Sequence, residues 1–120
     1  GQLANAARKI DGFPAGAARA SLGCELALRK GMLPAAKKAC AEAIAAFPES
    51  THARYLLGVV GELERKPADV VLQLTEVVAL DPSIDDAYVR LAAALKQLGK
   101  ADELAQLKVK FEAQFKKPLR

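Results

Sequence analysis

The sequence has few of the residues on which catalytic and metal sites depend. It has no tryptophan, one histidine and two cysteines in 120 residues, and aromatic side chains make up 5% of the chain. Cys24 and Cys40 have no second pair with which to form a thiolate zinc site, and His52 has no neighbouring ligand set. A glycine-rich phosphate loop and the common hydrolase motifs are also missing. We therefore expect no enzymatic activity, no metal and no cofactor.

Long apolar runs and a strong charge imbalance are absent too. No stretch of 18 apolar residues occurs, so we expect no membrane insertion. The net charge is +4, and part of the excess lies near the C-terminus, where cations complement the dipole of a last helix. We therefore expect no nucleic-acid partner. The N-terminus has no signal peptide and begins as if inside a helix, which suggests an excised fragment or a mature segment and leaves the compartment open.

What the sequence does have is alanine, which supplies much of the 52% of hydrophobic residues and favours helices. It also has a period. Pro14, Pro48 and Pro82 are each 34 residues apart, and small or apolar residues recur in phase with them. Self-similarity at this period is typical of stacked repeats. We therefore predict an all-α solenoid of three helix-turn-helix units.

The expected units are 17–50, 51–84 and 85–120, and residues 1–16 would hold the second helix of a truncated earlier repeat or an N-terminal cap. The helix pairs are predicted at 17–48, 51–82 and 85–116, with a leading helix near 2–12. Pro34 and Pro67 should open second helices, because a first helical position needs no N–H. Gly99 should end a helix, and Ser83 or Asp85 should cap the next one after Pro82.

These residues resemble the tetratricopeptide repeat, whose pattern is a large residue, Leu followed by Gly or Ala, a turn, a second apolar helix and a proline. Unit three has Tyr88, Leu91, Ala92 and Leu95, followed by Leu104, Lys108 and Phe111; unit two has Leu57, Gly58, Val70, Leu74, Val77 and Pro82; unit one has Ala36, Cys40, Ala43 and Pro48. The resemblance covers about residues 17–118 and implies a superhelix that binds other proteins. The alanine-rich composition also suggests a bacterial source.

The first helix of unit one departs from this pattern. Leu22 and Gly23 come one residue early relative to Leu57 and Gly58, so either Cys24 or Gly23 takes the small position. In the in-phase register, Cys24 and Cys40 face each other across one helix pair. We favour two buried free thiols, because cysteine is among the residues most often buried, and a disulfide is the alternative.

The resemblance implies a concave face lined by the first helix of each pair. The residues expected there are His52, Tyr55, Leu56, Val59, Glu62 and Leu63 from unit two, and Val89, Arg90, Ala93 and Lys96 from unit three. Repeats of this family that bind the acidic tails of chaperones use a carboxylate clamp. Ser21, Glu25, Leu56, Asp86 and Arg90 match its positions, but Arg90 alone fits its chemistry. We therefore predict no such clamp.

The middle of the face is apolar in sequence, which favours a hydrophobic or amphipathic helix as partner. The same residues could instead pack against a neighbouring repeat. We expect a scaffold or adaptor that holds a partner peptide. The alternative is a structural spacer, or a module that self-associates through its terminal helices.

Overall fold

The structure, a computed structural model, describes residues 15–119, and in this range it contains helices and no strand. The all-α prediction is confirmed. The helices are α2 (Ala15–Arg29), α3 (Leu33–Ala46), α4 (Thr51–Leu63), α5 (Pro67–Leu80), α6 (Asp85–Gln97) and α7 (Ala101–Phe115). The pairs match the expected ranges to within two residues. The helix expected near 2–12 lies outside the described residues.

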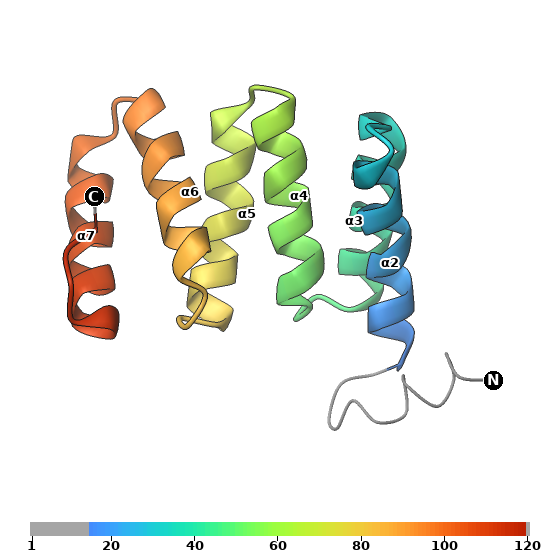
Figure 1. Ribbon diagram of the computed structural model, residues 1–120, viewed down its shortest axis with the longest axis horizontal. Coiled ribbons are helices and arrows are strands. Elements are labelled where there is room, and N and C mark those ends of the chain that lie inside the picture. Colours follow the sequence, from blue (N-terminus) through green and yellow to red (C-terminus); the bar gives the residue numbers. More distant parts are fainter. Residues whose placement is uncertain (1–14, 120) are drawn as a thin grey trace.

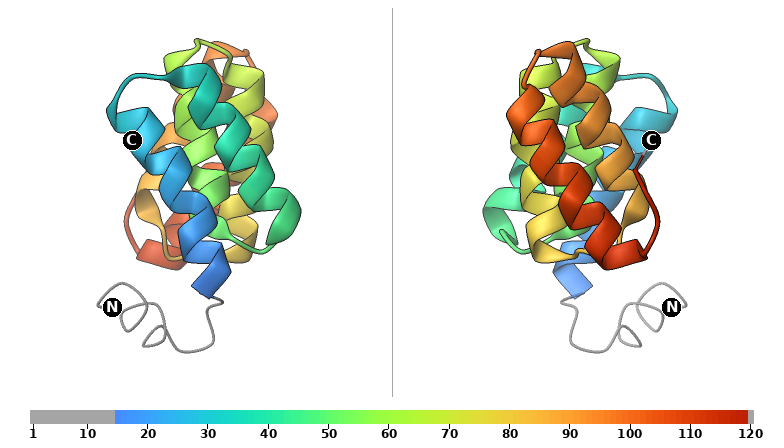
Figure 2. Two further views of the ribbon diagram at one scale, coloured as in Figure 1. Left: turned by 90° about the vertical axis from the view of Figure 1, so that its right-hand side faces the viewer. Right: turned by 90° about the vertical axis from the view of Figure 1, so that its left-hand side faces the viewer.

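The helices follow one another in chain order along the longest axis of the molecule (Figure 1). Its extents are 48 × 31 × 21 Å. Each helix packs on its partner within a pair, α3 packs on α4, α5 packs on α6, and α2 also touches α4. Figure 2 looks along the stack from both ends and shows α2 on one side and α3 on the other. This arrangement is the open solenoid that the period predicts.

The turn inside each pair is built the same way three times. Residues 31, 65 and 99 are 34 apart, and each has left-handed backbone, with φ of 73° for Gly31, 59° for Arg65 and 70° for Gly99. In each turn, the N–H of the following residue bonds back into the preceding helix, as Lys100 N does to Leu95 O at 3.0 Å. Such a left-handed residue closes a helix in the Schellman manner. Glycine tolerates this conformation without cost and arginine does not.

The second helices of units one and two have a proline in their first turn. Pro67 is the first residue of α5, as predicted, and Pro34 is the second residue of α3, which begins one residue earlier at Leu33. Ser50 caps α4 by accepting a hydrogen bond from the N–H of Ala53 at 3.3 Å. The expected cap on α6 is wrong for both candidates, because Ile84 takes the cap position and no side chain caps the helix. The Ser83 hydroxyl donates to the Asp81 carboxylate at 2.6 Å, and Asp85 is the first residue of α6.

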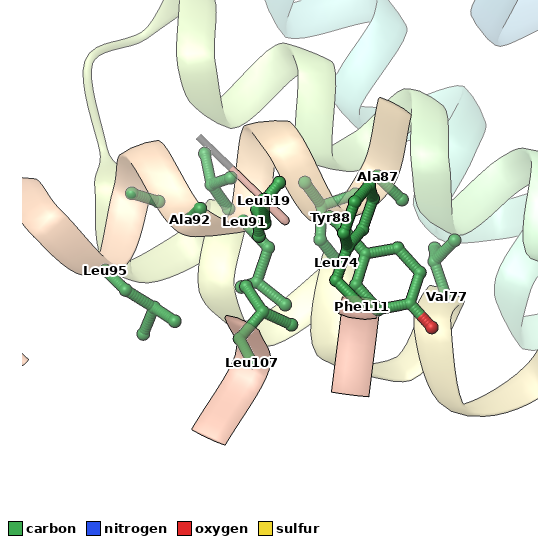
Figure 3. Packing of buried hydrophobic residues seen from close by; sticks show 12 residues of the cluster. Leu74, Val77, Ala87, Tyr88, Leu91, Ala92, Leu95, Leu107, Phe111 and Leu119 are labelled. Carbon is green, nitrogen blue, oxygen red and sulfur yellow. The ribbon is translucent and has the colours of Figure 1, made fainter. Parts of the chain in front are cut away.

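The larger hydrophobic core lies between α5, α6 and α7 (Figure 3). Tyr88 of α6 meets the rings of Phe111 and Phe115 edge-on, each at 5.5 Å between ring centres. After α7 the chain reverses at Lys116, which has a φ of 58°, and Leu119 then joins the core, with 7% of its surface exposed. Leu119 of the tail thus covers part of this end of the core.

The smaller core lies between α2, α3 and α4, and it resolves the register of unit one. Cys24 is fully buried and Gly23 is exposed, so Cys24 takes the small position. It faces Cys40 of α3 with 5.1 Å between the Cα atoms, and a disulfide joins the two residues. The structure thus has the cross-link that we ranked second to free thiols. In unit two the same contact is made by Gly58 and Leu74.

Candidate functional site

The first helices of successive units are tied together by polar side chains rather than by an open apolar strip. Arg90 of α6 reaches back to α4, where its guanidinium forms an ion pair with Glu62. Its Nε donates to Asp86 Oδ2 at 2.8 Å and to the Tyr55 hydroxyl at 2.9 Å. The Tyr55 hydroxyl in turn donates to Asp86. We call these four residues, Tyr55, Glu62, Asp86 and Arg90, the Arg90 cluster.

The protonation states in the Arg90 cluster are mutually stabilising. Burial alone would lower the pKa of Arg90, but the hydrogen bond to Asp86 and the charge of Glu62 outweigh it and raise the pKa. The hydrogen bond from Tyr55, followed by that from Arg90, lowers the pKa of Asp86. Burial and the hydrogen bond to Asp86 raise the pKa of Tyr55. One cation thus faces two carboxylates, and the cluster carries one net negative charge near neutral pH.

A second, looser polar contact joins α2 to α4. The Glu25 carboxylate lies 3.9 Å from His52 Nε2 and 3.3 Å from the Arg29 guanidinium. His52 is exposed and, among the described residues, has no metal-ligating cluster around it. It is a surface residue of α4, in agreement with the interpretation from sequence.

Leu56 does not lie on an open surface. It is 8% exposed and packs with Cys24, Cys40 and Val60 in the smaller core. The expectation that it lines the groove is therefore corrected. Leu56 faces back toward the preceding helix pair, because α4 packs against both α2 and α3.

The other apolar candidates are accessible to different degrees. Leu63 is 57% exposed and Val89 is 48% exposed. Tyr55 and Val59 are half-buried, and Ala93 and Lys96 are exposed. Next to the Arg90 cluster lies a hollow of about 360 Å³. Its lining combines the ends of α4 and α6 with the turn into α5, and it is formed by Glu62, Arg65, Lys66, Pro67, Val70, Arg90, Ala93, Ala94 and Gln97.

Comparison with solved structures identifies this arrangement of helices. The first tetratricopeptide domain of Spaghetti (RPAP3), bound to the HSP90 peptide SRMEEVD, is similar with a TM-score of 0.68 over 81% of this chain and 79% of that one, at 20% identity. The TPR2B domain of yeast Sti1, in a complex with pHsp70, has the same TM-score and identity over 83% and 82% of the two chains. The chain has the tetratricopeptide repeat fold.

Neither a family model nor a curated protein matches this sequence. The similarity is therefore one of tetratricopeptide architecture, and it does not bear on the expected bacterial source. None of the described helices is long and apolar enough to cross a membrane.

Within the tetratricopeptide fold, sequence reasoning missed the way in which Arg90 is used. The sequence placed Arg90 on the concave face as a residue open to a partner, but Asp86 and Glu62 of the same chain form ion pairs with it. The Asp86–Arg90 pair has the i, i+4 spacing at which opposite charges meet on a helix, and that signal was available. Glu62 is 28 residues away, and no local pattern predicts its contact.

Proposed function

We propose that this chain is a protein-interaction module that holds an apolar peptide or amphipathic helix on the face formed by α2, α4 and α6. The observation that carries the proposal is the exposure of Leu63 and Val89 beside half-buried Tyr55 and Val59. Large apolar side chains that stay exposed together on one face of a solenoid are typical of a docking surface. The two similar structures are complexes with chaperones or chaperone peptides, which supports binding of a peptide here.

The chemistry of the face argues against a chaperone tail as the ligand. Arg90 is the cation that a tail carboxylate would need, and two carboxylates of the chain compete for it. Glu25 lies at a further clamp position and would repel an acidic ligand. We expect the peptide SRMEEVD to give no saturable change in fluorescence anisotropy with this protein. Binding in the micromolar range would refute this part of the proposal.

A matched pair of substitutions tests the face itself. Val89→Lys places a charge on the proposed surface, and Val109→Lys makes the same change on α7, a second helix of its pair, where Val109 is 69% exposed. Both side chains are accessible, so both variants should fold. Peptides selected against the wild type from a displayed random library should lose binding to Val89→Lys and keep it for Val109→Lys. Equal binding to both variants would contradict the proposal.

A structural or self-associating role is the alternative, and one observation favours it. Leu22 and Leu26 of α2 are 44% and 45% exposed, whereas their equivalents in unit two, Leu56 and Val60, are buried. Light scattering after size-exclusion chromatography separates the two functions. A mass that rises with concentration and falls back to the monomer in Leu22→Lys would favour self-association. A constant monomer mass would remove this alternative.

We further propose that the chain acts by binding and not by catalysis. The Arg90 cluster contains the strongly interacting polar groups of this face, and Arg90 is a permanent cation that cannot serve as a base. Tyr55 and Asp86 are held in their neutral and ionised forms, respectively. The Arg90 cluster therefore does not contain a nucleophile paired with a base.

A further inference from the structure

The two cysteines of the chain meet at a single contact. Cys24 is the small residue of α2 and Cys40 is the residue of α3 that packs against it; both are fully buried. Their Cα atoms are 5.1 Å apart, within the range that a disulfide spans without movement of the backbone. The two cysteines of the sequence thus lie at facing positions where a cross-link joins the two helices of one unit.

The same two positions in the other units carry different chemistry. In unit two they hold Gly58 and Leu74, which pack closely against each other. In unit three they hold Ala92, which is buried, and Lys108, which is exposed. The example of unit two shows that packing of this contact does not require sulfur. Two cysteines at the positions of Gly58 and Leu74 are explained by the bond between them.

The cross-link lies in the first helix pair that the structure describes. In this pair Leu22 and Leu26 of α2 are each more than two-fifths exposed. A disulfide removes freedom from the unfolded chain without needing a neighbour.

We infer that Cys24–Cys40 is a structural disulfide that holds α2 to α3, and that the protein therefore matures in a thiol-oxidising compartment. Disulfides of this kind persist where thiols are oxidised and are rare where glutathione and thioredoxin keep them reduced. Formation of the bond removes two protons and two electrons from the thiols. The electrons pass to the disulfide of a thiol–disulfide exchange protein, which is released as a dithiol.

Burial of the cross-link determines how it responds to reductant. A thiolate must reach a sulfur atom in line to break the bond, and neither cysteine offers accessible surface. Reduction of the folded protein should therefore require α2 and α3 to separate first. The disulfide is therefore a permanent structural cross-link and does not act as a redox switch.

Mass spectrometry on the full chain tests the bond directly. Cells that make the protein are quenched in acid, and the chain is unfolded and alkylated without reductant. We expect a mass lower than that of the dithiol by two hydrogen atoms and no alkylated cysteine. Alkylation of both thiols would overturn the inference about the compartment.

A graft from unit two tests the structural role. In the variant Cys24→Gly/Cys40→Leu, the contact has the residues of Gly58 and Leu74, so it should pack without sulfur. We expect reductant to lower the melting temperature of the wild type and to leave that of the graft unchanged. An equal change in melting temperature of the two proteins, or rapid reduction of the folded wild type without denaturant, would refute the structural role of the disulfide. The mass measurement remains decisive if the graft fails to fold.

Discussion

Replacing Gly58 by alanine tests the helix contact that defines the register of the array. A Cβ atom at this position would lie 2.9 Å from Leu74 Cδ2 and 3.1 Å from Leu74 Cγ. Leu74 is fully buried, so it has little room to move. Gly23 of α2 provides the matched control, because a Cβ there would meet only the Cβ of Ala39, at the ordinary distance of 3.8 Å.

The difference between the two variants isolates the packing cost. Alanine is favoured over glycine inside a helix by about 1 kcal/mol, and this gain applies to both positions. Forcing an extra carbon into a filled core costs about 1–3 kcal/mol. Gly23→Ala should therefore raise the free energy of unfolding by up to about 1 kcal/mol. Gly58→Ala should be less stable than Gly23→Ala by about 1–3 kcal/mol.

Urea unfolding followed by circular dichroism measures both free energies under the same conditions, provided that the denaturant slopes agree. The difference corresponds to a shift in melting temperature of roughly 4 °C for each kcal/mol in a domain of this size. A double variant, Gly58→Ala with Leu74→Val, should recover part of the loss, because the two residues touch. If Gly58→Ala and Gly23→Ala are stabilised equally, the close contact between Gly58 of α4 and Leu74 of α5 is wrong.

Three further predictions concern a turn, the tail and the Arg90 cluster. Arg65→Gly should stabilise the protein by about 1 kcal/mol by relieving left-handed backbone, and Gly99→Arg should destabilise it by a similar amount, both measured by urea unfolding; no change in either would contradict the argument about the turns. Leu119→Ala should cost about 2 kcal/mol because a buried side chain is truncated, and a loss below about 0.5 kcal/mol would mean that the tail does not cap the core. The lowered pKa of Asp86 predicts a stabilising contribution that is present above about pH 4 and lost as the pH falls through its folded pKa. The raised pKa of Tyr55 predicts a stabilising contribution that is present below about pH 10 and lost as the pH rises through its folded pKa. Melting temperatures across this pH range should show both losses of stability in the wild type. In Tyr55→Phe the melting temperature should change less with pH.

The fold was predictable because its determinants are local and repeated. Prolines at a spacing of 34 mark the joints between units, and Pro34, Pro67 and Gly99 set helix ends through their own backbone restrictions. These effects act within a few residues of the chain, so they are readable without knowledge of packing. Arg65 shows the limit of such signals, since it adopts the left-handed conformation of Gly31 and Gly99 with a side chain that does not indicate it.

The candidate site was predictable only in part, because its details depend on how helices rotate against each other. The position of Leu56 on its helix does not say whether it faces outward or toward the preceding pair, and burial against Cys24 and Cys40 decides it. The tail depends on a reversal at Lys116 that brings Leu119 back onto the core. Both features require the packed structure, which the helical period alone does not specify.

The Arg90 cluster changes how specificity on this face should be understood. Because Arg90 is held by Asp86 and Glu62, a ligand carboxylate that used it would have to displace one of them and leave that carboxylate without its partner. The displaced carboxylate would lose its ion pair and stay close to the ligand carboxylate, whose like charge would repel it. This exchange of one ion pair for another supports the proposal that the ligand is apolar and not acidic. The cluster also joins α4 to α6 through Tyr55, Glu62, Asp86 and Arg90, so under the proposed function it would hold the two helices that carry Val59 and Val89 in a fixed arrangement.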